Sequence, residues 1–368
     1  MRVIQVLALA FAVVLGCQRP NDSNAREDAQ RPLTQSAKAG GPSIELTGAG
    51  ATFPYPLYSK WISVYQHDHP GVLINYQSIG SGGGIRQITE RTVDFGASDA
   101  PMTDEELAKA PSPLLHVPMT LGAVTVTYNA GALKLPLRLT PDVIAGVFLG
   151  EITKWNDPKL TSLNPGVKLP DAAISVVHRS DGSGTTAIFT EFLAATVPRW
   201  KEKVGAGKSV SFPVGMGAKG NEGVAGQLKT SPGAFGYVEL AYAIETKLPY
   251  ASVQNKAGQF VEPSLDGITA AAAGAAPAMP NDMRAFIVNA SGEGAYPISG
   301  FTYILFYKNQ QDPQKGRALG EFLWWAVHDG QSHGPPLHYA KLPAQTVTRV
   351  EDVLRSIKAN DQPVLAPR

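Results

Sequence analysis

The sequence predicts an α/β protein with two globular lobes, and three observations predict it. A chain of 368 residues is too long for one compact core. Its 43% hydrophobic and 17% charged residues are typical of folded rather than disordered chains. Short apolar runs alternate with amphipathic stretches, as strands alternate with helices in α/β domains. Because 32 basic and 31 acidic residues leave a net charge of only +1, we expect no nucleic-acid partner, and any anion has to be bound by a local site.

The N-terminal segment predicts export and a lipid anchor. After a short basic start, residues 3–15 are almost entirely apolar, which is typical of a secretory signal and too short for a mature membrane-spanning helix. Cys17, the only cysteine, follows directly in a segment that resembles the lipobox of bacterial lipoproteins. That resemblance implies an extracytoplasmic protein, in the periplasm or at the cell surface, held to a bacterial membrane by a lipid on Cys17. The alternative is an ordinary signal with an incidental thiol. We expect a signal peptide at 1–16 and a polar, flexible tether at 17–43.

The first folded unit is expected to begin with a strand at 44–47, where the polar tether ends, followed by a glycine loop at 48–51. A helix comes next, since two prolines suit its start and five large side chains recur on one face. The apolar run 72–77 predicts a second strand, and the glycine-rich run 80–84 leads from it into a short helix. The five side chains of the first helix are Leu57, Tyr58, Trp61, Ile62 and Tyr65.

The remaining elements follow the same reasoning. Strands are predicted where apolar runs are bounded by turn residues, and helices where apolar side chains recur at helical spacing. An alanine-rich stretch at 269–278 is either a plain helix or a surface segment, without a predicted function. The predicted strands are 93–97, 121–128, 174–177 and 301–307; one helix contains Ile188, Phe189, Phe192 and Leu193, and another spans 316–328.

Four polar loops predict a site for a small oxyanion. Each follows a strand, and a helix begins at three of them; ligands of open α/β sheets bind at such strand ends. Glycine lets the backbone approach a ligand, and the first turn of a helix leaves N–H groups unpaired near a partial positive charge. A single loop of this kind is a common turn, so the recurrence is the evidence. The loops are residues 48–51, 80–84, 98–99 and 179–185.

The loop at 179–185 is the richest of the four. Arg179 can place two donors on two oxygens of a tetrahedral anion, while Ser183 and Thr185 offer hydroxyl and backbone donors. A structural interpretation makes Arg179 and Asp181 an ordinary ion pair, and Ser183 or Thr185 a helix N-cap. Both interpretations can hold together, because an Arg179–Asp181 pair would orient the guanidinium.

Asp99 is unexpected in an anion site, because like charges repel. An ionised aspartate can only accept hydrogen bonds, so it favours a ligand that carries a proton. Phosphate keeps a proton near neutral pH and sulfate does not, so Asp99 would select phosphate over sulfate. The alternative is an aspartate that merely forms a turn ahead of Pro101.

Six motifs, in order along nearly the whole chain after the tether, carry a family resemblance. They are GAGATFP at 48–54, IGSGGG at 79–84, VDFGASDAP at 93–101, RSDGSGT at 179–185, GNEG at 220–223 and GYVE at 236–239. As a set they resemble the phosphate-binding receptors of phosphate-specific ABC importers. The resemblance implies a two-lobed type II periplasmic-binding-protein fold, with a ligand cleft between the lobes and two crossover segments. It also implies high-affinity capture of inorganic phosphate outside the cytoplasm and its delivery to ABC transporter permease subunits.

The resemblance further implies which residues hold phosphate. We expect lobe 1 at 44–127 plus 298–368 and lobe 2 at 128–297. Gly82 stands where many relatives have a second serine, and His178 and Ser180 also differ from the frequent pattern, which leaves affinity and pH dependence open. The implied phosphate contacts are Thr52, Phe53 through its backbone, Ser81 and the proton-accepting Asp99 from lobe 1, and Arg179, Ser183, Gly184 and Thr185 from lobe 2, with Asp181 and Gly82 in support.

Two other functions stay open at this point. Another tetrahedral oxyanion could bind on the same fold. A phosphate-ester hydrolase would draw on His178, Asp181 and Ser183, but proximity in sequence is no evidence of triad geometry, and no GxSxG elbow or P-loop lysine is present. The seven histidines show no paired-ligand pattern for a metal. We therefore expect a monomeric binding protein that is not an enzyme, without metal or cofactor, that contacts the membrane only through its N-terminal lipid.

Overall fold

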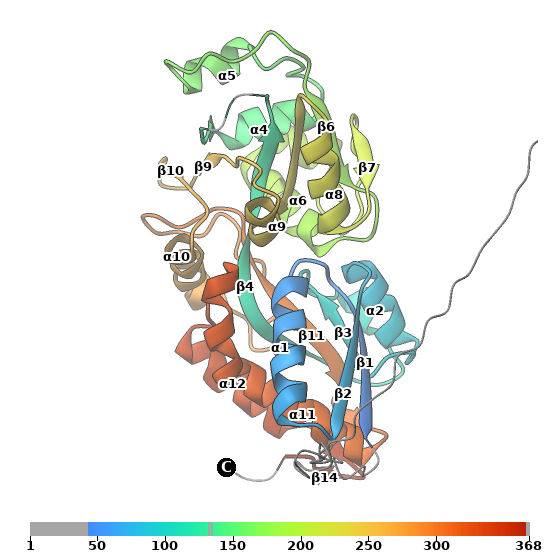
Figure 1. The fold of residues 1–368 in the computed structure, drawn as a ribbon. Coiled ribbons are helices and arrows are strands. Elements are labelled where there is room, and N and C mark those ends of the chain that lie inside the picture. Colours follow the sequence, from blue (N-terminus) through green and yellow to red (C-terminus); the bar gives the residue numbers. More distant parts are fainter. Residues whose placement is uncertain (1–42, 132, 134, 366–368) are drawn as a thin grey trace, which may run out of the picture. The chain divides into compact units, whose positions relative to one another are not determined.

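A mixed sheet of eight strands organises the described residues, which are 43–131, 133 and 135–365 of the computed structural model. The three strands at one edge are parallel to one another, as are the three at the other edge, and the two central strands run antiparallel to their neighbours. In spatial order the strands are β2 (Val72–Ser78), β1 (Ile44–Gly50), β3 (Phe95–Ser98), β11 (Ser299–Tyr307), β4 (Leu114–Asn129), β8 (Ala234–Glu239), β6 (Ser175–Arg179) and β7 (Met216–Ala218) (Figure 1).

The long strand β4 joins the two halves of this sheet. Its 16 residues are almost all buried, and it pairs with β11 as far as Ala123 and with β8 from Val124 onward. Figure 1 shows it as a long strand that extends from beside β11 into the upper half of the picture. The ladder with β11 shifts register between Thr302 and Tyr303, next to Pro118. Because proline has no N–H to donate, such an irregularity is the expected response to proline inside a sheet.

Helices pack on both halves of the sheet. α1 and α11 contact β2 and β1 respectively, α2 packs on β3 and β1, and α6 and α8 both contact β8. The helices are α1 (Tyr55–Asp68), α2 (Ser81–Thr89), α3 (Asp104–Leu107), α4 (Pro141–Phe148), α5 (Pro158–Leu163), α6 (Gly184–Thr196), α7 (Pro198–Lys203), α8 (Gly220–Thr230), α9 (Leu240–Glu245), α10 (Leu265–Ala275), α11 (Pro313–Val327) and α12 (Ala344–Arg355).

Short elements complete the described part of the chain. Two small sheets each contain three strands, in the orders β10-β9-β5 and β12-β13-β14. These strands are β5 (Arg138–Leu139), β9 (Ser252–Gln254), β10 (Phe260–Val261), β12 (Asn309–Gln310), β13 (Lys358–Ala359) and β14 (Gln362–Pro363), and the 3-10 turns are Ala276–Ala278, Asp329–His333 and Pro335–Leu337.

Most of the predicted elements are confirmed. The predicted strands at 44–47, 72–77, 121–128 and 301–307 lie within β1, β2, β4 and β11, and those at 93–97 and 174–177 overlap β3 and β6. The helix at 316–328 corresponds to α11, and the alanine-rich stretch falls largely in the plain helix α10. On α1, four of the five predicted side chains are buried and Ile62 is partly buried.

The glycine loop predicted at 48–51 is wrong in its position, because Gly48–Gly50 continues strand β1. These glycines are needed for close packing rather than for a turn. A Cβ at Gly48 would lie 2.1 Å from the ring of Phe95, and one at Gly50 would lie 2.0 Å from the carbonyl oxygen of Ala97. The loop proper begins at Ala51.

The glycine run at 80–84 also differs from its prediction as a loop. Helix α2 begins at Ser81, so the run provides the helix's first turn. A Cβ at Gly84 would lie 2.6 Å from the Cα of Gly50. Glycine here lets the start of a helix approach the end of a strand, which brings its free N–H groups close to the loops around it.

The signal peptide at 1–16, Cys17 and all of the tether except Ser43 lie outside the described residues. Within the residues that are described, no helix combines the length and the apolar character needed to cross a membrane.

Candidate functional site

The predicted loops meet around the hydroxyl of Ser81. Its Oγ accepts hydrogen bonds from the N–H of Gly184 at 3.0 Å and from the N–H of Asp99 at 3.2 Å. It also lies 3.3 Å from Asp99 Oδ2, to which it donates. Ser81 begins α2, Asp99 follows β3 and Gly184 begins α6. Three loops that are far apart in the sequence therefore converge at one buried point.

Asp99 is a buried carboxyl with two distinct oxygens. The residue is only 2% exposed. Oδ1 accepts a hydrogen bond of 2.8 Å from the hydroxyl of Thr302, whereas Oδ2 faces Ser81. Burial raises the pKa of Asp99 to about 7, against the hydrogen bond from Thr302, the charge of Arg179 and the hydrogen bond from Ser81, which lower it. Near neutral pH this carboxyl can therefore either accept or donate a proton.

Arg179 forms the ion pair with Asp181 that the sequence suggested. Its Nε and Nη2 donate to the two carboxylate oxygens at 2.7 and 2.5 Å. Asp181 also accepts from the N–H of Gly220 at 3.1 Å. Burial acts to raise the pKa of Asp181, but the hydrogen bonds and charge of Arg179 outweigh it and hold that pKa below its usual value.

This ion pair limits how Arg179 can contact an anion. Asp181 occupies the Nε–Nη2 side of the guanidinium, so Arg179 cannot use that side to fork onto an anion. Nη1 is oriented differently and donates to Thr185 Oγ1 at 3.3 Å. The guanidinium is thus fixed in direction, and its Nη1 end is the part directed toward the site.

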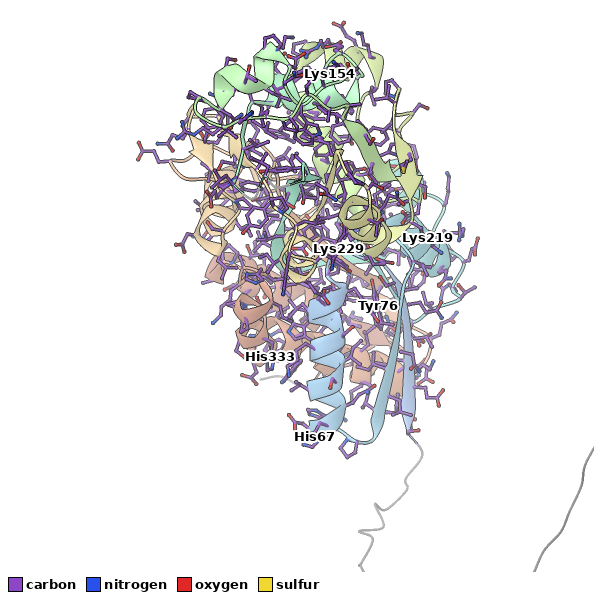
Figure 2. All side chains as sticks on the ribbon, turned by 45° about the horizontal axis from the view of Figure 1, so that its top comes forward. His67, Tyr76, Lys154, Lys219, Lys229 and His333 are labelled. Carbon is purple, nitrogen blue, oxygen red and sulfur yellow. The ribbon has the colours of Figure 1, made fainter. Side chains whose placement is uncertain are left out.

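Thr52 and Phe53 are held by their backbone. The hydroxyls of Tyr242 and Tyr339 donate to the carbonyl oxygens of Thr52 and Phe53 at 2.6 and 2.7 Å. Tyr76, labelled in Figure 2, donates in the same way to Ala51 at 2.7 Å. Three tyrosine hydroxyls therefore fix three consecutive carbonyl groups of the loop that follows β1. Thr52 and Phe53 are both buried.

Ser183 and Gly184 form the start of α6. Ser183 is the N-cap, because its Oγ accepts from the N–H of Thr186 at 2.9 Å, so the structural interpretation of this residue is confirmed. A Cβ at Gly184 would lie 2.4 Å from Ser81 Oγ and 2.5 Å from Asp99 Oδ2. No other residue type fits at position 184 without displacing these groups.

Gly82 has a backbone role. Its N–H donates to the carbonyl oxygen of Gly182 at 2.8 Å, and a Cβ on Gly82 would lie 3.1 Å from the Cα of Gly182. A side chain at this position would require the neighbouring backbone to move by a few tenths of an ångström. Where many relatives have a serine hydroxyl, Gly82 instead allows a direct contact between α2 and the loop after β6.

The arrangement offers hydrogen-bond donors to an anion while carrying little net charge itself. The N-termini of α2, α6 and α8 all contribute residues to it, and each carries a partial positive charge. Arg179 is neutralised by Asp181. Ser81, Asp99, Ser183, Thr185 and Thr52 are each buried to 98% or more. A group bound here would exchange water for oriented, mostly neutral donors.

The hydrolase alternative finds no support in this geometry. Nδ1 of His178 interacts with the carbonyl oxygen of Arg179 at 3.0 Å, and its ring stacks on Phe212 with centroids 4.4 Å apart. Asp181 pairs with Arg179, and Ser183 caps a helix. The three residues that a hydrolase would need are each engaged with other partners.

Known proteins match most of the chain. A family model described as a PBP superfamily domain matches residues 34–329. The phosphate-binding protein PstS of Xylella fastidiosa is 44% identical over 351 residues, which cover 94% of this chain and 95% of that protein. PstS of Pasteurella multocida is 44% identical over 318 residues, or 86% of this chain and 92% of that protein. The chain belongs to the PstS family.

A solved structure extends the likeness of this PstS-family protein to its fold. PfluDING, a high-affinity periplasmic phosphate-binding protein solved with bound phosphate, aligns with a TM-score of 0.67 at 22% identity, covering 84% of this chain and 93% of that one. The predicted type II periplasmic-binding-protein fold is thereby confirmed. The prediction of a binding protein rather than an enzyme agrees with the relatives, which are named as binding proteins. The lobe boundaries at 127/128 and 297/298 stay a prediction.

Two site residues of this PstS-family protein were missed in the sequence. Thr302 lies in strand β11, 203 positions from the Asp99 that it contacts, and no local signal distinguishes it from other strand residues. Asn221 at the start of α8 donates to Thr52 and Thr185. It lies within the GNEG motif, so that motif was a usable signal, although it did not reveal the contact.

Proposed function

We propose that this chain binds inorganic phosphate outside the cytoplasm and delivers it to the permease subunits of an ABC importer. The names of its relatives and the phosphate bound to PfluDING support this ligand. Delivery fits a protein whose binding groups come from both predicted lobes, because a ligand that bridges them stabilises a closed arrangement that a permease can recognise.

In this proposal the phosphate is surrounded by donors. Each charge-assisted hydrogen bond contributes roughly 1.5–3 kcal/mol, so a handful supports micromolar or tighter binding after ordering costs. The proposed donors and acceptor are Thr52, the backbone of Phe53, Ser81, Asp99, Arg179, Ser183, Gly184 and Thr185, with Asp181 orienting Arg179 and Gly82 joining the two loops.

Asp99 is the observation that favours phosphate in particular. Its Oδ1 accepts from Thr302, and its Oδ2 accepts from Ser81 but keeps a second lone pair for a ligand beside Gly184. One proton between Oδ2 and a phosphate oxygen makes one hydrogen bond, whichever partner carries it. Sulfate brings no proton near neutral pH, so it can bind well only where Asp99 supplies its own.

The anchor is a separate part of the proposal. A lipid on Cys17 would hold a monomer at the membrane surface, with the polar segment up to residue 43 as its tether. Replacing Cys17 with alanine should release the protein from the membrane fraction. Unchanged membrane fractionation of that variant would argue for an ordinary signal.

Equilibrium dialysis with labelled phosphate tests the ligand. We expect saturable binding at micromolar concentration or below, competed by unlabelled phosphate and only weakly by sulfate at pH 8 or above. Arg179→Ala should lose most of this affinity, because it removes the guanidinium of the site and leaves Asp181 without its charged partner.

A surface substitution provides the matched control. Arg317→Ala removes a guanidinium from an exposed ion pair with Glu321 on α11, and we expect its phosphate binding to be unchanged. If the unaltered chain shows no saturable uptake, the proposed function is wrong. If sulfate binds more tightly than phosphate, another oxyanion is the ligand of this fold.

A further inference from the structure

Asn221 donates its side-chain amide to two threonine hydroxyls of the candidate site. Nδ2 lies 2.8 Å from Thr52 Oγ1 and 3.0 Å from Thr185 Oγ1. Asn221 is fully buried at the start of α8, two positions after the N-cap residue Lys219, which is labelled in Figure 2. One amide therefore contacts both the loop after β1 and the first turn of α6.

The orientation of this amide is fixed by its other end. Oδ1 of Asn221 accepts a hydrogen bond of 3.0 Å from the N–H of Glu239, which can only donate. The oxygen must therefore point toward Glu239, and the NH₂ group must point toward the threonines. The hydrogen bonds around the amide settle which atom is nitrogen.

Each threonine hydroxyl has its acceptor capacity filled. Thr52 Oγ1 accepts from Nδ2 of Asn221 and also from its backbone N–H at 3.2 Å. Thr185 Oγ1 accepts from Nδ2 of Asn221 and from Nη1 of Arg179 at 3.3 Å. A hydroxyl has two lone pairs and one hydrogen, so with both lone pairs used it can take part in further bonds only by donating.

We propose that Asn221 is a positioning residue that makes Thr52 and Thr185 obligate donors toward the bound oxyanion. This inference rests on the proposed function. Because the amide is neutral, it directs two donors without adding a second positive charge. An added cation would strengthen the binding of phosphate and sulfate alike, whereas directed hydroxyls leave the choice between them to Asp99.

The arrangement also fixes how a protonated ligand is oriented. A phosphate O–H placed against Thr52 or Thr185 would meet a donor hydrogen and lose its hydrogen bond. Asp99, whose carboxylate can only accept, is the acceptor that the site offers beside this donor set. The proton of the ligand is therefore directed to Asp99, and Asn221 contributes to specificity although it does not touch the phosphate.

Asn221→Asp reverses the polarity of this contact while nearly preserving its shape. A carboxylate accepts from both hydroxyls, so their hydrogens turn away from the ligand, and it adds a negative charge. We expect phosphate affinity to fall at least 100-fold near pH 8, relative to the unaltered chain at the same pH. Protonation of the new carboxyl restores a donor, so this ratio should shrink as the pH falls.

Asn221→Ala removes the amide, so the hydroxyls of Thr52 and Thr185 lose their fixed orientation but are not turned into acceptors. We expect a loss of roughly tenfold, and the ratio to the unaltered chain should be independent of pH. In a Thr52→Val, Thr185→Val background, where no hydroxyl remains to be directed, the same substitution should change affinity by less than about twofold. If Asn221→Ala does not fold, Asn221→Ser replaces it in the cycle.

Asn129→Ala is the matched control. Nδ2 of Asn129 donates to the carbonyl oxygens of Leu228 and Lys229 at the far end of α8, and Lys229 is labelled in Figure 2. Losing these bonds perturbs the same helix without touching the threonines, so phosphate affinity should stay unchanged. Calorimetric titration with inorganic phosphate between pH 5.5 and 8.5 measures all of these variants.

Two results would overturn the inference while leaving the proposed function intact. One is a loss of phosphate affinity on Asn221→Ala that is equally large in the Thr52→Val, Thr185→Val background. Such additivity is what a merely structural role of Asn221 predicts. The other is an Asn221→Asp loss that does not change with pH. If the unaltered chain itself binds no phosphate, the proposed function fails and this inference fails with it.

Discussion

The ionisation of Asp99 predicts that discrimination against sulfate depends on pH. Burial raises the pKa of this carboxyl to about 7. Below that pH the carboxyl is mostly protonated and can donate to a sulfate oxygen; above it the carboxylate repels sulfate and has nothing to accept from it. Sulfate affinity should therefore fall as the pH rises through about 7.

The magnitude follows from the protonated fraction. One pKa unit corresponds to about 1.4 kcal/mol. At a pH about 1.5 units above the pKa, protonating Asp99 so that it can donate to sulfate therefore costs about 2 kcal/mol. Sulfate affinity should then be about 30-fold weaker at pH 8.5 than at pH 5.5. Phosphate retains a proton of its own across this range, so its affinity should change by less than about fivefold.

Calorimetric titration of both anions at constant ionic strength measures the effect, because salt would otherwise screen the charges differently. Asp99→Asn is the control: it is neutral at every pH, so it should bind phosphate, bind sulfate better than the unaltered chain does at pH 8.5, and show no pH dependence for sulfate. Sulfate affinity that stays flat between pH 5.5 and 8.5 in the unaltered chain would refute the reasoning about Asp99. A pH dependence of sulfate affinity that persists in Asp99→Asn would refute it as well.

Three further predictions concern the same site. Gly184→Ala should abolish phosphate binding in calorimetry while circular dichroism stays native, because its Cβ would crowd Ser81 and Asp99; measurable binding would mean that α6 can shift. In urea unfolding without phosphate, Asp99→Asn should increase the free energy of unfolding by about 2–4 kcal/mol near pH 8 and by almost nothing near pH 4. The raised pKa means that the unaltered chain loses stability as the pH rises from about 4 through 7, and equal gains at both pH values would contradict this. Lys208 of predicted lobe 2 forms a 2.8 Å ion pair with Glu106 of predicted lobe 1, and at this partial exposure the pair contributes about 0.2–1 kcal/mol to holding the lobes together. Because Lys208→Ala removes this pair, release of phosphate measured by stopped flow should accelerate by up to about fivefold. Glu106→Gln should have the same effect. Additive effects of the two substitutions would show that they act separately.

Local chemistry allowed much of the site to be predicted from sequence. Ser183 as a helix N-cap and the Arg179–Asp181 ion pair both involve residues a few positions apart, where residue type and spacing constrain geometry. The fold class followed from alternating apolar and amphipathic segments. In these cases each segment carries its own information.

Contacts between distant segments could not be read in this way. Thr302 reaches Asp99 only because β11 pairs with β3, and the alternation of apolar residues along a strand does not show which strand is its neighbour. Gly82 was interpreted as a missing serine, and its role became clear only with Gly182 against it. Gly48 likewise suggested a turn, because a glycine needed for packing is indistinguishable in sequence from one needed for a turn.

The position of β11 in the sheet has a consequence for how the chain folds. β11 separates β3 from β4, although both are synthesised long before the chain reaches Ser299. Until β11 emerges, neither strand has its neighbour on that side, and their unpaired edges invite aggregation. Such late, long-range pairing slows folding. A chain that delays its own folding is well suited to crossing a membrane unfolded, so the same topology that brings Thr302 to Asp99 also suits the export predicted from its first residues.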